Sequence, residues 1–67
     1  MARTTYHVTP VNGGWLVKRA GARALDSFHR DKDAAITRAR ELAGAARSGQ
    51  VKVHLENGRV QITYICR

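Results

Sequence analysis

The sequence predicts a single α+β domain in which one helix packs on one face of an antiparallel four-stranded sheet, in the order strand, strand, helix, strand, strand. Three observations predict this fold. Apolar and polar residues alternate in two pairs of segments, and a glycine turn joins each pair, as in a β-hairpin. Between the hairpins, apolar residues recur at helical spacing. The length of 67 residues suits one small domain, so we expect one domain over residues 1–67, with 1–3 and 66–67 flexible.

The first hairpin is predicted for residues 4–19. Residues 4–10 alternate and are β-branched or aromatic at most positions, which is typical of a strand. Pro10 marks the end of this strand because proline cannot donate a ladder hydrogen bond. The Asn-Gly-Gly segment at 12–14 favours a tight turn, since Asn and Gly tolerate positive φ. Residues 15–19 then form the returning strand.

The segment between this hairpin and the helix has a weaker pattern. Residues 20–24 are mostly Ala and Gly, which indicates a loop. Residues 25–28 are predicted to be a short extended piece, and it is not counted among the four strands. We expect it to place Leu25 or Phe28 in the core, with Phe28 closing one end.

The helix is predicted from Lys32 to about Arg47. Asp31 is the expected N-cap, because a short acidic side chain there favours the positive end of the helix dipole. Gly49 is expected just beyond the helix as its C′ residue. The apolar positions fall on one arc of the helix, which lets it lie close on a sheet; they are Ala35, Ile36, Ala39, Leu42, Ala43 and Ala46.

The second hairpin is predicted for residues 51–65. Residues 51–55 alternate strictly, and Asn57-Gly58 is a strong hairpin turn signal. Residues 59–65 alternate again and form the last strand.

The alternation assigns each strand residue to one of two faces. The core is expected to hold Tyr6, Val8, Trp15, Val17, Ile36, Ala39, Leu42, Ala43, Val51, Val53, Leu55, Val60, Ile62 and Tyr64. The uncovered face of the sheet is expected to carry Thr5, His7, Thr9, Leu16, Lys18, Lys52, His54, Gln61 and Thr63. This face is polar and basic, and none of these residues is acidic.

The net charge is the main functional signal. Twelve Lys and Arg residues against five Asp and Glu give +7. Acidic residues are missing before Asp26, whereas the charges of the helix region nearly balance. Such an excess indicates either an anionic partner or a contribution to solubility alone.

Two sequence elements resemble a known family. The first is Tyr6-His7-Val8-Thr9-Pro10 followed by Asn12-Gly13-Gly14-Trp15-Leu16-Val17-Lys18, and the second is the Ala-rich helix at 35–43. Together they resemble DUF2188, a family of small bacterial proteins catalogued as a domain of unknown function, over residues 6 to about 60. The resemblance implies a bacterial, cytoplasmic protein with this strand order, and it transfers no catalytic or binding residue. The basic helix entry at 28–31 and the Ile-Cys-Arg ending depart from the family pattern.

Catalytic and metal chemistry are not expected. His7, His29 and His54 lack the close spacing of a metal site, and Cys66 is the single cysteine, so no disulfide forms within the chain. We predict no enzymatic activity, no cofactor and no small-molecule substrate. The sequence has no apolar run of the ~18 residues that a membrane helix needs and no signal-peptide pattern, so we expect no membrane contact.

The predicted function is therefore that of a non-catalytic binding module. It would act by protein–protein contact, as a homodimer or with an acidic partner, through the basic sheet face or an edge strand. The alternative is low-specificity, salt-sensitive nucleic-acid binding through the same surface. Sheets that bind nucleic acids usually stack bases on exposed aromatic side chains, and the sequence places its Tyr and Trp residues in the core. The candidate contact residues are Lys18, Arg19, Arg23, Lys52, His54 and His7.

Overall fold

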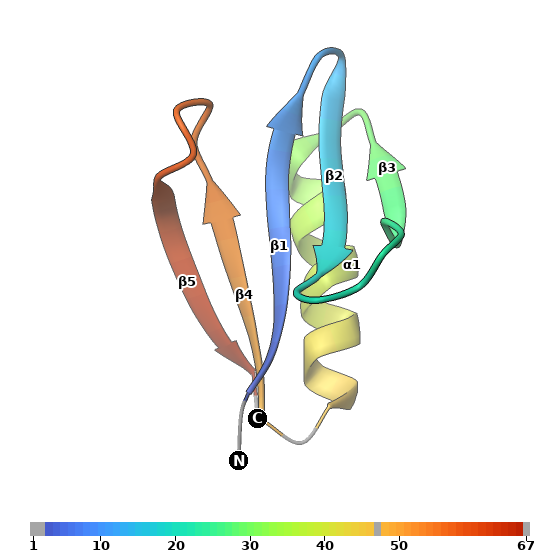
Figure 1. Ribbon diagram of the computed structural model, residues 1–67, viewed down its shortest axis with the longest axis vertical. Coiled ribbons are helices and arrows are strands. Elements are labelled where there is room, and N and C mark those ends of the chain that lie inside the picture. The colour runs from blue at the N-terminus through green and yellow to red at the C-terminus, as the bar shows by residue number, and fades with distance from the viewer. Residues whose placement is uncertain (1–2, 47, 67) are drawn as a thin grey trace.

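The computed structural model describes residues 3–46 and 48–66 and shows one helix behind a twisted sheet (Figure 1). Met1, Ala2 and Arg67, which were expected to be flexible, lie outside the described residues, as does Arg47 near the expected helix end. The elements in chain order are β1 (Thr4–Val11), β2 (Gly14–Arg19), β3 (Ser27–His29), α1 (Lys32–Ala45), β4 (Gly49–His54) and β5 (Val60–Cys66).

The sheet is five-stranded and mixed, so the predicted antiparallel four-stranded sheet is wrong. Its strand order is β3-β2-β1-β4-β5, and β1 pairs with β4 in parallel. The reason is β3, the short extended piece, which pairs antiparallel with β2. This third strand reverses the direction in which the chain enters the helix, and hence the direction of β4. Two hairpins that would have joined antiparallel therefore join through a parallel pair at the centre (Figure 1).

The core lies between α1 and the central strands. Its fully buried residues are valines from the sheet and alanines from the helix: Val8, Val17, Val51, Val53, Ala35, Ala39 and Ala43. The alanines recur every four residues and form one stripe along α1. Because this stripe carries only methyl groups, the helix lies close on the sheet. Tyr6, Trp15, Ile36, Leu42 and Tyr64 pack around this centre and are half-buried, which confirms their predicted core positions.

Four residues predicted in the core are exposed instead: Phe28, Leu55, Val60 and Ile62. Phe28 and Val60 are exposed because of the strand register: they pair with Leu16 and His54 and so lie on the side of the sheet away from the helix. Ile62 is exposed because one helix does not cover all five strands. It packs mainly across β4, β1 and β2, and β5 lies at the edge farthest from it (Figure 1). Ile62 still lies on the helix side, opposite the buried Val53, yet it is 39% exposed.

A bulge in β5 corrects one further prediction, the position of Gln61 on the uncovered face. The pairing with β4 shifts between Val53 and His54, so Gln61 is an extra residue in the ladder. Its side chain turns to the helix side, where the Lys32 ammonium donates a 2.7 Å hydrogen bond to Gln61 Oε1. The same ammonium lies 5.4 Å from the ring centre of Trp15.

The ends of α1 follow the predicted signals in part. Asp31 is the N-cap residue, as predicted, although its side chain makes no capping hydrogen bond. The last helical residue is Ala45, and Ala46 caps the helix in an extended conformation. Gly49 is therefore not a C′ residue. It is the buried first residue of β4.

Candidate functional site

The face of the sheet that α1 leaves uncovered is the most distinctive surface of the domain. The alternation of buried and outward residues, together with the strand register, defines it. We call it the open face; it consists of Thr5, His7, Thr9, Val11, Leu16, Lys18, Phe28, Gln50, Lys52, His54, Val60, Thr63 and Ile65. None of these residues is acidic. Gln50 donates a 2.9 Å hydrogen bond to Thr5 across the central parallel pair.

Four of the six predicted contact residues meet at the centre of the open face. His7 on β1 lies opposite Lys18 on β2 and opposite Lys52 on β4. His54 follows Lys52 by two residues and therefore points to the same side of β4. We call these four residues the His–Lys cluster. The parallel pairing of β1 with β4 brings the two histidines together.

The two histidines are directly hydrogen-bonded. His7 Nδ1 lies 2.7 Å from His54 Nε2, and the ring centres are 4.9 Å apart. His54 Nδ1 lies 3.0 Å from the backbone carbonyl oxygen of Gly58. A carbonyl only accepts, so His54 carries its proton on Nδ1 and, when neutral, accepts through Nε2 from the Nδ1–H of His7.

This environment favours the uncharged form of His7. Partial burial lowers the pKa of His7, and His54, Lys52 and Lys18 lower it further by charge repulsion. His7 therefore stays neutral at a pH where an ordinary histidine is partly charged. The formal positive charges of the cluster are those of Lys18 and Lys52.

The remaining predicted contact residues, Arg19 and Arg23, lie apart from the cluster. Arg19 is next to Lys18 in β2, and neighbouring residues of a strand point to opposite faces. Arg19 thus lies on the helix side, opposite Tyr6. Arg23 lies exposed in the loop between β2 and β3.

Phe28 is an open-face residue that the sequence analysis missed. It lies on β3 opposite Leu16 and is 48% exposed, so its predicted role in closing the core is wrong. Its ring lies over Gly14, where a Cβ atom would come within 2.6 Å of Phe28 Cζ. The alternation Ser27, Phe28, His29 contained this signal, but only if residues 27–29 are read as a strand of the sheet.

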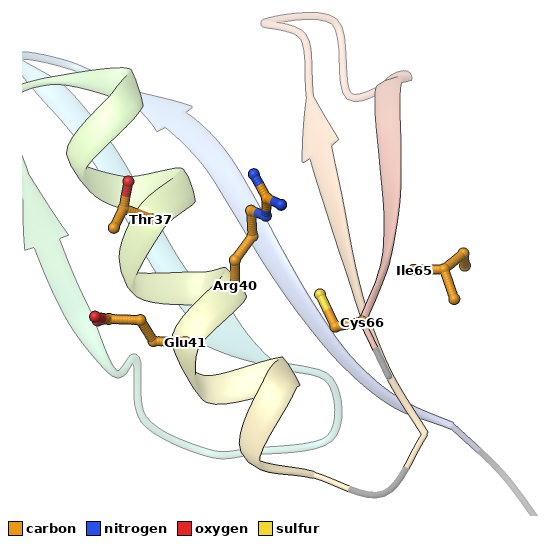
Figure 2. A pocket seen from close by; sticks show the side chains of 5 residues that line it. All are labelled: Thr37, Arg40, Glu41, Ile65 and Cys66. Carbon is orange, nitrogen blue, oxygen red and sulfur yellow. The ribbon is translucent and has the colours of Figure 1, made fainter.

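A groove lies between α1 and β5 (Figure 2). Thr37, Arg40 and Glu41 line it from the helix, and Ile65 and Cys66 line it from the strand. The Arg40 guanidinium lies 4.8 Å from the ring centre of Tyr64. Figure 2 shows Arg40 and Cys66 reaching into the space between the elements, whereas Ile65 points away. The groove combines one cation with one anion, and it therefore selects less for ligand charge than the open face.

The described residues contain neither a cluster of metal ligands nor a helix that could span a membrane. Over residues 3–46 and 48–66, no three His, Cys, Asp or Glu side chains lie close enough together to share a metal ion. In the described part of the chain, α1 is too short and too polar to span a bilayer.

The chain matches the model of one protein family. The family model described as "Uncharacterized protein conserved in bacteria (DUF2188)" matches residues 6–66. The chain belongs to the DUF2188 family. This match confirms the resemblance seen in the Gly-Gly-Trp hairpin and the Ala-rich helix, and it extends through β5 of this DUF2188 domain. Searches among curated proteins and among solved structures returned no significant match.

Proposed function

We propose that this DUF2188 domain is a non-catalytic binding module whose open face holds single-stranded nucleic acid with low sequence specificity. One observation supports this function above all others. The open face carries no acid, and it combines two lysines with an exposed aromatic ring, Phe28. An acidic protein partner would use the lysines but would give the ring no special role.

The two lysines suit a phosphodiester backbone. Lys18 and Lys52 lie on the strands that flank β1, so their backbones are two strand spacings apart, about 10 Å. A backbone that crosses β1 would lie between two ammonium groups. Phosphate contacts of this kind supply affinity without base selection, and counterion release makes them sensitive to salt.

The rings on the same face suit unpaired bases. Phe28 presents an aromatic surface near one edge of the sheet, and the imidazoles of His7 and His54 lie near the centre. Bases stack on such rings without a strong sequence preference, because every base has a flat π face. A duplex keeps its bases stacked inside, so a sheet face that offers exposed rings favours single strands.

A salt titration tests this proposal. Lys18→Gln combined with Lys52→Gln should lower the slope of log affinity against log salt by about 1.4, since each phosphate contact on a single strand contributes ~0.7. The measurement is fluorescence anisotropy of a labelled mixed-sequence oligonucleotide between about 50 and 200 mM salt.

The matched control removes two positive charges from the helix instead. Arg38 and Arg40 are exposed on α1, and the Arg38 ion pair with Asp26, 3.1 Å long, is a surface pair of small energetic weight. Arg38→Gln with Arg40→Gln should leave the slope unchanged. Equal slopes for both double variants, or no binding by the wild type at low salt, would overturn the proposal. Equally tight binding of an acidic polypeptide would favour the acidic-partner alternative.

Self-association through β5 is a second candidate function, and a separate observation favours it. β5 is an edge strand with no charged residue between Val60 and Cys66, although the chain carries +7. Val60 is 45% exposed and Ile65 is 50% exposed. Edge strands are usually protected by charges or Pro, and an unprotected edge can pair with a second chain.

We expect Ile62→Lys to abolish such pairing, because a charge at the centre of the edge repels its own copy. Sedimentation velocity over a range of protein concentrations measures the effect. The wild type should approach a dimer as concentration rises, whereas the variant should stay a monomer. A wild type that is monomeric throughout this range would rule out the β5 interface.

A further inference from the structure

The hydrogen-bonded histidine pair has a property that phosphate binding by the two lysines does not require. His54 Nδ1 is engaged by the Gly58 carbonyl, and His54 Nε2 accepts from His7 Nδ1. The remaining ring nitrogen, His7 Nε2, then holds a lone pair. In the neutral pair this is the nitrogen that remains able to take up a proton.

The first and second protons have different consequences for this pair. A proton on His7 Nε2 leaves the Nδ1–H···Nε2 bond to His54 intact. A further proton on His54 Nε2 would set two N–H groups against each other at 2.7 Å, between two positive rings. The hydrogen bond of the pair is therefore compatible with one added proton and opposes a second.

The charged groups around the pair oppose even the first proton in the free protein. Lys18 faces His7 from β2, and Lys52 faces it from β4 together with His54. On β5 the facing residue is Thr63, which does not titrate, and the β4–β5 turn carries Glu56 and Arg59. A phosphate held by Lys18 and Lys52 would offset their repulsion and would accept a hydrogen bond from a protonated His7 Nε2.

We infer that the His7–His54 pair makes the His–Lys cluster a proton-linked phosphate subsite, in which one phosphate group binds together with about one proton at His7 Nε2. This inference rests on the proposed function for its biological ligand, the phosphate of a nucleic-acid strand. The linkage is reciprocal: protonation strengthens phosphate binding, and bound phosphate strengthens protonation. The pair thereby converts a drop in pH into tighter binding on the open face.

The sign of the pH effect follows from this linkage. Bound phosphate raises the pKa of His7, so affinity rises as pH falls from the bound-state value toward the free-state value. Between these two values, affinity should change by up to about tenfold per pH unit, because one proton is taken up. Outside that range the affinity should level off.

Oligonucleotide binding at fixed ionic strength, measured between about pH 5 and 8, tests the inference. His7→Gln should lose most of the pH dependence, and the quantity compared between the variants is the slope of log affinity against pH rather than the affinity itself. The control is His29→Gln, because His29 lies on β3 away from the pair and contacts Ser27 at 2.8 Å. His29→Gln should keep the full pH dependence. A pH-independent wild type, or a pH-dependent His7→Gln variant, would overturn the inference and leave the proposed function standing.

A second measurement separates the two claims. The imidazole signals of the wild type are titrated by NMR, with and without inorganic phosphate, so no nucleic acid is involved. We expect phosphate to raise the pKa of His7 and to have no effect on the imidazole signals of His29. An unchanged pKa of His7 overturns the subsite even if oligonucleotides bind. A raised pKa in a protein that binds no oligonucleotide supports the subsite and refutes the proposed nucleic-acid function.

Discussion

Gly49→Ala is expected to destabilise the domain by about 3 kcal/mol or more, because a Cβ atom at this position meets backbone that cannot move aside. Gly49 is the buried first residue of β4. A Cβ there would come within 2.6 Å of the Ala43 carbonyl carbon and within 2.8 Å of Ala43 Cα, and it would overlap the Ala43 carbonyl oxygen. Since Ala43 belongs to the alanine stripe, relief would require α1 to move away from the core.

The matched substitution lies five residues earlier in the chain. Gly44 is exposed in α1, and a Cβ atom there would meet nothing within 4 Å. Gly44→Ala should therefore stabilise the domain by up to ~1 kcal/mol through helix propensity. Urea unfolding followed by circular dichroism measures both variants. If Gly49→Ala unfolds within 0.5 kcal/mol of the wild type, a small surface-like effect, the close approach of α1 to β4 is wrong.

The local elements of this fold follow from local signals. The strong hairpin turns at Gly13 and Gly58 have φ values of +85° and +87°, and the alanine spacing correctly predicted the buried side of α1. The direction of the sheet does not follow from such signals. It depends on whether the three residues of β3 pair with β2, and three residues carry too little alternation to show this.

How far the core extends across the sheet also could not be predicted from the sequence. Alternation correctly assigned Ile62 to the helix side, but it does not say how far the helix reaches. Exposure of Ile62 depends on the width of one helix against five strands, which is a property of the assembled layers. The position of Gln61 depends on a one-residue bulge, and no turn or glycine signal marks it.

The centre of the candidate site was predictable as a set of residues but not as a contact. Alternation placed His7, Lys18, Lys52 and His54 on one face. Their proximity depends on the register of the parallel pair, in which His7 lies opposite Lys52. The hydrogen bond between the histidines also depends on the Gly58 carbonyl, which orients His54. These are tertiary features that one sequence does not reveal.

Phe28→Ala is expected to weaken oligonucleotide binding by roughly 5- to 150-fold, which corresponds to ~1–3 kcal/mol for one stacked base. The ring is 48% exposed at the sheet edge and rests over Gly14, so it is available to a ligand in the free protein. Phe28→Tyr keeps the aromatic surface and should bind like the wild type. Neither substitution changes the charge, so the dependence of affinity on salt should stay as in the wild type.

The most direct test of the open face compares two ligands of equal charge. One is a single-stranded oligonucleotide, and the other is an abasic strand of the same length with the same phosphates. We predict that Phe28→Ala weakens binding of the base-containing strand and leaves binding of the abasic strand unchanged, with folding of the variant checked by circular dichroism. Equal affinities of the wild type for both strands, or an equal loss for both in Phe28→Ala, would contradict the proposal that this face holds nucleic acid by its bases.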